Sequence, residues 1–82
     1  MKTLYKFSAS WCSPCKQLSK VLSEVDTSNY TIIEIDIDED VVKTASYGIR
    51  GVPTLVVLDE NLVEVNRKTG SMTKAQLEQF LR

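Results

Sequence analysis

Two cysteines three residues apart are the side chains of this sequence with the clearest chemical use. Cys12 and Cys15 enclose only Ser13 and Pro14, and they stand where an apolar, strand-like segment gives way to a helical pattern. A Cys-X-X-Cys pair in this position is typical of thiol–disulfide exchange. The free N–H groups and the dipole at a helix start favour a thiolate, the reactive form of the thiol. The spacing puts both sulfurs on one face and within bridging reach, so we predict a redox-active disulfide.

Their places in the helix predict separate roles for the two thiols. Cys12 lies at the end of the helix, so we expect it to be the exposed nucleophile. Cys15 lies one turn inside, so we expect it to be more buried and to act as the resolving thiol, which attacks the mixed disulfide.

Other uses of two cysteines fit the composition less well. A zinc site needs about four ligands, whereas this chain has two cysteines and no histidine, so only a dimer that pools two pairs would serve. A structural disulfide across so short a loop would stabilise the fold little. The lack of histidine also excludes Cys–His protease chemistry. We therefore expect no metal and no cofactor.

Length and charge limit the kinds of partner. The 82 residues are enough for one domain, residues 1–82, and the net charge is −1 with scattered basic residues. Nucleic acid and anionic membranes both need a basic face, so neither is an expected partner. Lys6 interrupts the apolar start, which is unlike a signal peptide, and no run approaches the roughly 20 apolar residues of a membrane span. We expect a cytoplasmic protein, in a compartment that keeps thiols reduced.

Hydrophobic periodicity predicts an α/β fold with the order βαβαββα. Thr73 with Gln76 forms a capping-box pattern at the start of the last helix, and Gly48 suits the end of the second helix. The first two strands must be parallel and the last two form a hairpin, so the sheet should be mixed. The expected strands are residues 4–9, 30–37, 54–58 and 62–67, and the expected helices follow Pro14, run from 38 or 39 to 45, and begin after Thr73.

Three further motifs stand in order along the chain. The first is Trp11-Cys12-Ser13-Pro14-Cys15-Lys16, which resembles the Trp-Cys-Gly-Pro-Cys-Lys site of the thioredoxin family with Ser13 in place of glycine. The second, similar to the segment that carries the family's cis-proline, is Tyr47-Gly48-Ile49-Arg50-Gly51-Val52-Pro53-Thr54-Leu55. The third is Gly70, before the final helix. The resemblance implies a thioredoxin fold of glutaredoxin size that lacks the leading strand and helix, with a four-stranded mixed sheet flanked by three helices.

The resemblance also implies a substrate-binding surface. Val52-Pro53 would be cis and would pack against the cysteine pair, and the neighbouring backbone could pair with an extended substrate strand. Trp11, Val52, Pro53 and Gly70 would form a shallow apolar contact surface. Two simpler interpretations stay open: Trp11 as a packing aromatic and Gly70 as an ordinary turn glycine.

Two positions depart from the family pattern. The family has a buried aspartate beneath the resolving cysteine and a lysine on the adjacent strand, whereas the matching positions here hold Lys6 and Glu34. We hypothesise that these two side chains pair, and that Glu34 or a bound water takes the proton of Cys15. A cation near Cys15 would also lower the pKa of its thiol directly. Alternatively, Glu34 and Asp36 are solvated charges that discourage pairing at a sheet edge.

The inner pair Ser13-Pro14 resembles thioredoxin more than glutaredoxin, so the predicted activity is a protein-disulfide reductase, a dithiol electron carrier. Its partners would be disulfide-containing client proteins and a thioredoxin reductase, and we expect a monomer. One alternative is a glutaredoxin with glutathione as electron donor, whose carboxylates could meet Lys16, Arg50 and Lys74. Another is a non-catalytic thioredoxin-like binding subunit, which would tolerate the loss of both thiols.

Overall fold

The computed structural model describes residues 1–82 and confirms the predicted βαβαββα order. The helices and strands, in chain order, are β1 (Lys2–Ser8), α1 (Ser13–Ser23), β2 (Tyr30–Asp36), α2 (Val41–Ser46), β3 (Thr54–Leu58), β4 (Glu64–Thr69) and α3 (Lys74–Phe80).

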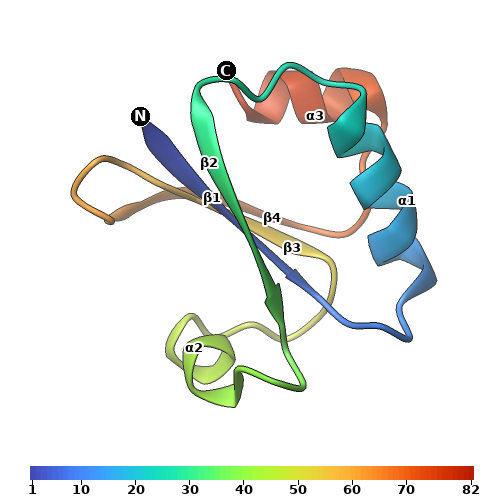
Figure 1. The fold of residues 1–82 in the computed structure, drawn as a ribbon, viewed down its shortest axis with the longest axis vertical. Helices are drawn as coiled ribbons and strands as arrows, with labels where there is room; N and C mark the ends of the chain where they lie inside the picture. The colour runs from blue at the N-terminus through green and yellow to red at the C-terminus, as the bar shows by residue number, and fades with distance from the viewer.

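The four strands form one mixed sheet, as predicted, in the order β2-β1-β3-β4 (Figure 1). β1 is parallel to β2 and antiparallel to β3, and β3 is antiparallel to β4. In this register Lys6 on β1 stands opposite Glu34 on β2. β2 is an outer strand, so the Lys6–Glu34 row runs from the centre of the sheet to its edge.

Successive residues of β1 enter two different hydrophobic cores, because side chains alternate between the faces of a strand. Leu4 belongs to the core shared with α1 and α3, whereas Tyr5 belongs to the core on the opposite face, where Tyr47 and Ile49 pack. Figure 1 shows α1 and α3 close together and α2 apart from them, beyond the end of β2. The larger core consists of Leu4, Leu18, Leu22, Leu55, Val57, Met72 and Leu77.

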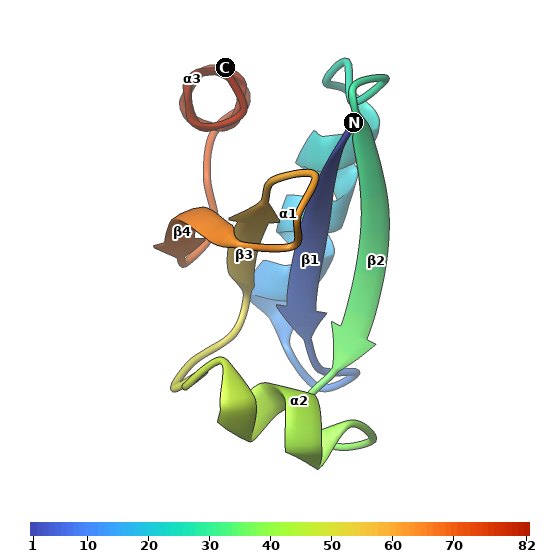
Figure 2. The ribbon, with the colours of Figure 1, turned by 90° about the vertical axis from the view of Figure 1, so that its left-hand side faces the viewer.

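One end of the sheet gathers the segments that carry the cysteine pair and its neighbours. The arrowheads of β1 and β2 both point toward the end where α2 lies (Figure 2). α1 begins just after β1 ends, and β3, which runs the other way, begins at the same end. The Cys12–Cys15 segment and the Val52-Pro53 segment therefore meet at this end of the molecule.

The bounds of several elements differ from the predicted ones. β1 runs over Lys2–Ser8 rather than residues 4–9, and β2 ends at Asp36 rather than at residue 37. α2 begins at Val41, because the Asp40 carboxylate accepts the N–H of Lys43 and caps the helix there. β4 is Glu64–Thr69 rather than residues 62–67. The turn before β4 is longer than predicted, since the Asp59 carboxylate accepts two backbone N–H groups and Leu62 has a positive φ of 62°.

Both predicted helix signals are confirmed. Gly48 follows α2 with φ 61°, and its N–H donates to Ala45 while the next N–H donates to Thr44, a Schellman arrangement that glycine favours. Thr73 and Gln76 form the reciprocal capping box of α3. None of the three helices combines the length and the apolar character that crossing a bilayer requires.

Candidate redox site

The cysteine pair lies at the very start of α1. Cys12 is the N-cap residue, and its Sγ accepts a hydrogen bond of 3.1 Å from the backbone N–H of Cys15. The two residues form a disulfide with their Cα atoms 5.3 Å apart, inside the usual range of about 4.4–6.8 Å. Pro14 stands in the first turn, where its missing N–H breaks no helical hydrogen bond. The sulfur of Cys12 therefore stands where the helix start favours negative charge.

The expected exposure of Cys12 is wrong for the disulfide form, whereas the expected burial of Cys15 is confirmed. Cys12 is 4% exposed and Cys15 is 2% exposed, so both are buried. Ala9 clusters with the pair, and Ile37 and Val52 pack against this cluster. The helix position of Cys12 suggested exposure, but residues distant in sequence cover it.

The Val52-Pro53 peptide bond is cis, and this segment lies against the cysteine pair. Pro53 is fully buried, so the expected surface of four residues is wrong at this position: Pro53 lies beneath it. The carbonyl of Pro53 accepts the N–H of Gly70 at 2.8 Å, and Gly70 adopts a φ of 103° that side chains other than hydrogen disfavour. This hydrogen bond thus connects the segment after β4 to Pro53.

The backbone of Val52 has no partner in the main chain. Neither its N–H nor its C=O takes part in a backbone–backbone hydrogen bond. Its side chain is half-buried against the cluster of Ala9, Cys12 and Cys15. A donor and an acceptor are therefore free beside the disulfide.

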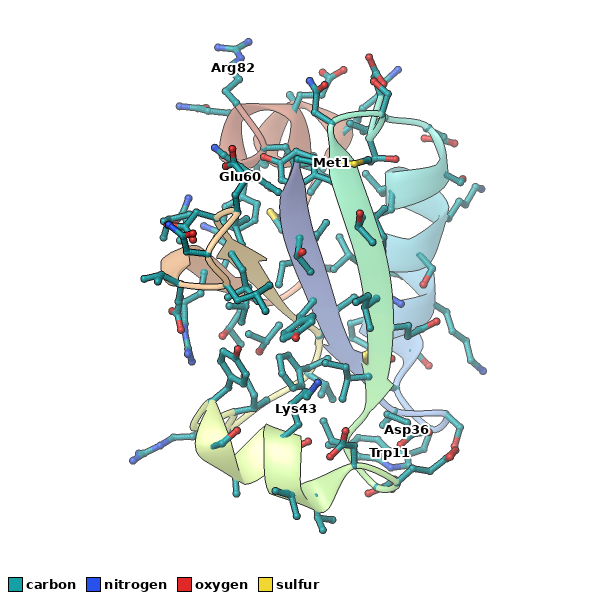
Figure 3. The ribbon with its side chains drawn as sticks, turned by 60° about the vertical axis from the view of Figure 1, so that its left-hand side comes forward. Met1, Trp11, Asp36, Lys43, Glu60 and Arg82 are labelled. Carbon is teal, nitrogen blue, oxygen red and sulfur yellow. A yellow bond between two sulfur atoms is a disulfide. The ribbon has the colours of Figure 1, made fainter.

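Trp11 lies outside the core. Its side chain is 66% exposed, so Trp11 is not the packing aromatic of the alternative interpretation. Its indole N–H donates to Asp38 Oδ2 at 2.9 Å, which fixes the ring to the segment between β2 and α2. In Figure 3, Trp11 and Asp36 lie at the α2 end of the molecule, opposite Met1 and Arg82.

Lys6 and Glu34 are paired beneath α1. Lys6 is 4% exposed, and its Nζ donates to Glu34 Oε2 at 2.9 Å and to Ser19 Oγ of α1. Ser8 Oγ also donates to Glu34 Oε2 at 2.9 Å. The hydrogen bonds from Lys6 and then from Ser8 hold the pKa of the Glu34 carboxyl below its usual range. The side chain of Glu34 is 62% exposed on the edge strand, so Glu34 is both a paired and a solvated charge.

An open groove of about 680 Å³ runs along this pair and reaches Cys15. Its walls come from the end of β1, from α1, from β2 and from the segment that leads into α2, and they carry charges of both signs. The residues that line it are Lys6, Ser8, Ala9, Ser10, Cys15, Lys16, Ser19, Ile33, Glu34, Ile35, Asp36, Glu39, Asp40 and Lys43.

Sequence reasoning missed three partners of the predicted site residues. Ser19 could have been found, because it stands four residues after Cys15 and so shares its helix face. Ser8 could have been found from its place two residues after Lys6 on the same face of β1. The Asp38 contact with Trp11 had no signal in the sequence, since it depends on how the segment after β2 folds back.

Comparisons with known proteins agree on one family. The family model described as Thioredoxin matches residues 1–82. The thioredoxin of Pseudomonas aeruginosa is 37% identical over 81 residues, which are 95% of this chain and 74% of that protein. The thioredoxin of Bacillus subtilis is 36% identical over 81 residues, 95% of this chain and 77% of that protein. Among solved structures, a mutant thioredoxin from Halobacterium salinarum superimposes with a TM-score of 0.86 at 31% identity, covering 98% of this chain and 71% of the other.

Proposed function

Because the chain belongs to the thioredoxin family and is a thioredoxin-type thiol–disulfide oxidoreductase, we propose that it reduces disulfides in client proteins, with Cys12 as nucleophile and Cys15 as resolving thiol. The observation that carries this proposal is the place of the pair at the start of α1, with the sulfur of Cys12 accepting the N–H of Cys15. That N–H and the helix dipole favour a thiolate at Cys12 over one deeper in the helix.

The first step joins the protein to its client. The Cys12 thiolate attacks one sulfur of the client disulfide, so that a Cys12–client bond forms and the client S–S bond breaks. The client's other sulfur leaves as a thiolate and takes a proton from solvent. Cys12 is covered in the disulfide form, so we propose that reduction of the pair frees its sulfur for this attack.

The second step releases the client. Cys15 loses its proton and attacks the sulfur of Cys12, which re-forms the Cys12–Cys15 disulfide and expels the second client thiolate. The client has then gained two electrons, and the cysteine pair has lost two. An electron donor must return two electrons and two protons before the next turnover.

We propose that the client docks as an extended strand over Trp11, Val52 and Gly70, with Pro53 beneath them. The free N–H and C=O of Val52 support this, because they can pair with the backbone of such a strand. The exposed indole of Trp11, the residue before Cys12 in the chain, supplies further apolar area. The fixed backbone of Val52 would align the client sulfur with Cys12.

Reduction of insulin disulfides, followed by turbidity with dithiothreitol as donor, tests the proposal. The native chain should accelerate reduction, and Cys12→Ser and Cys15→Ser should each fall to the rate of dithiothreitol alone. Val42→Ala, at a 78% exposed position of α2, should keep the native rate. A binding subunit would be indifferent to both cysteine changes, and that result would overturn the proposal.

The proposed donor is a thioredoxin reductase, and the proposed place of action is the cytoplasm, where thiols stay reduced. Coupling the insulin assay to NADPH through a thioredoxin reductase, and separately through glutathione with glutathione reductase, distinguishes this donor from glutathione. NADPH oxidation only in the first assay is expected. Oxidation only in the second would assign a glutaredoxin function instead.

A further inference from the structure

We propose that Lys6 is a positioning residue that holds a positive charge beneath Cys15 and stabilises its thiolate, and that Glu34 serves to hold Lys6 rather than to take the proton. This inference rests on the proposed function, since it concerns the resolving step of that reaction. The charge of this buried lysine would thus lower the pKa of the Cys15 thiol and so make the resolving thiolate form more readily.

The burial of Lys6 calls for an explanation. It is the one charged residue among the buried ones. A buried ammonium is costly unless it is paired, and even a paired one often stabilises a fold no better than an apolar side chain. The position on β1 is flanked by Leu4, which packs in the α1–α3 core. An apolar residue would therefore suit this site for stability alone.

Geometry connects Lys6 to Cys15. The ammonium of Lys6 donates to Ser19 Oγ, and Ser19 lies one helical turn after Cys15 on the same face of α1. Lys6 and Cys15 also line the same groove. The positive charge thus lies between β1 and the helix face that carries the resolving sulfur. A cation at such a place favours the thiolate.

Glu34 is poorly suited to accept the Cys15 proton. Its Oε2 already accepts hydrogen bonds from Lys6 and from Ser8, both at 2.9 Å. These bonds lower the pKa of its carboxyl and so make it a weaker base. The side chain is also 62% exposed to water. The proton of Cys15 can leave to solvent through the open groove, while Glu34 keeps the ammonium of Lys6 in place.

Other charged groups also face the groove at Cys15 and affect its thiol. α1 contributes Lys16, β2 contributes Glu34 and Asp36, and the segment from the end of β2 into α2 contributes Glu39, Asp40 and Lys43. Unlike these other charged groups, Lys6 is buried and donates a hydrogen bond to α1. Its removal should therefore affect the thiolate of Cys15 most strongly.

The inference predicts opposite responses from the two partners. Lys6→Met removes the cation and leaves the Glu34 carboxylate, so the pKa of the Cys15 thiol should rise by about one unit. Glu34→Gln keeps a side-chain oxygen that can accept the hydrogen bond from Lys6 and removes only the negative charge, so the pKa of the Cys15 thiol should stay the same or fall. A pair with only a structural role would leave the pKa of the Cys15 thiol unchanged in both folded variants.

The measurement is the pH titration of the Cys15 thiolate by ultraviolet absorbance, in the full chain with Cys12→Ser so that only one thiol titrates. Lys6→Arg keeps the charge and should restore a pKa close to that of the parent. Lys20→Met removes an exposed lysine from α1 and should leave the pKa unchanged. Circular dichroism confirms that each variant is folded.

A Cys15 pKa that does not rise in Lys6→Met would overturn the inference. A rise in Glu34→Gln would do the same, because removal of a negative charge beside the Lys6 cation should favour the thiolate if that cation sets its pKa. Either failure is distinct from a failure of the proposed function, which is measured by turnover with both cysteines present. If Lys6→Met does not fold, Lys6→Gln removes the charge in its place and keeps a polar end for Ser19 and Glu34, and the pKa of the Cys15 thiol should rise in the same way.

Discussion

Cys12 and Cys15 differ less in burial than in the groups that stabilise each thiolate. Cys12 stands at the N-cap, where the N–H of Cys15 points at its sulfur, whereas Cys15 faces the side of α1 that Ser19 and Lys6 occupy. The helix start would thus serve the attacking thiol and the buried lysine the resolving thiol. Under the proposed roles, these two separate sources of positive potential would allow the two thiols to ionise at different stages.

The Lys6–Glu34 pair should also make stability depend on pH. The pKa of Glu34 is lowered in the folded state, so its contribution is present above the unfolded pKa of about 4.3 and is lost as pH falls through the folded pKa. Glu34→Gln should cost about 1 kcal/mol near neutral pH, between the values of exposed and buried pairs. Urea unfolding of both chains between neutral and acid pH measures this. A difference that persists or grows in acid would contradict the assignment.

Short local signals determine most of the helix and turn ends in this chain. Asp40 caps α2, Gly48 ends it, and Thr73 with Gln76 opens α3. Asp40, Thr73 and Gln76 satisfy nearby backbone groups with their side chains, and Gly48 does so with its own N–H at a positive φ. Such local signals were enough to predict α3 and the end of α2. The start of β4 was wrong by two residues, because the bulge at Val57/Leu58 and the Asp59 turn depend on pairing between strands.

Thr73→Ala should destabilise the fold by about 1 kcal/mol, because it removes the hydroxyl that accepts the N–H of Gln76. Ser71→Ala, two residues earlier and exposed, should change stability by less than about 0.5 kcal/mol. Thermal or urea unfolding of the three chains provides the comparison. Equal stability of the two variants would show that the capping box contributes nothing.

The free energy of unfolding of the whole molecule should be small, because a chain of this length buries only about 60–65% of the surface that it exposes when unfolded. Its two main cores lie on opposite faces of one sheet. The core under α1 also supports the cysteine helix, since Leu18 and Leu22 of α1 pack in it. Loss of packing there should therefore lower both stability and the fixed placement of Cys15.

Leu18→Ala should cost about 3 kcal/mol of unfolding free energy, because Leu18 is fully buried and its loss leaves a cavity. Val42→Ala, at a position 78% exposed, should cost less than about 0.5 kcal/mol. Both are measured in the disulfide form by urea unfolding. Similar losses in the two variants would mean that Leu18 does not anchor α1.

The sequence alone was sufficient for the order of elements and the cysteine pair, which follow from periodicity and local spacing. The pairing of Lys6 with Glu34 was predicted from the resemblance to the thioredoxin family, and the register of β1 and β2 places the two residues opposite each other. The burial of Cys12, the position of Pro53 beneath the surface and the bond from Trp11 to Asp38 could not be predicted. Each depends on segments far apart in sequence, namely Ile37, Val52 and the loop before α2, that come together only in the folded chain.

The most direct test of the central claim is which cysteine forms the bond to a client. Reduced Cys15→Ser and reduced Cys12→Ser are each mixed with insulin, and the products are separated without reductant and weighed by mass spectrometry. Cys15→Ser should accumulate a mixed disulfide through Cys12 that dithiothreitol releases, and Cys12→Ser should accumulate almost none. A mixed disulfide that forms mainly through Cys15 would contradict the assignment of Cys12 as the nucleophile.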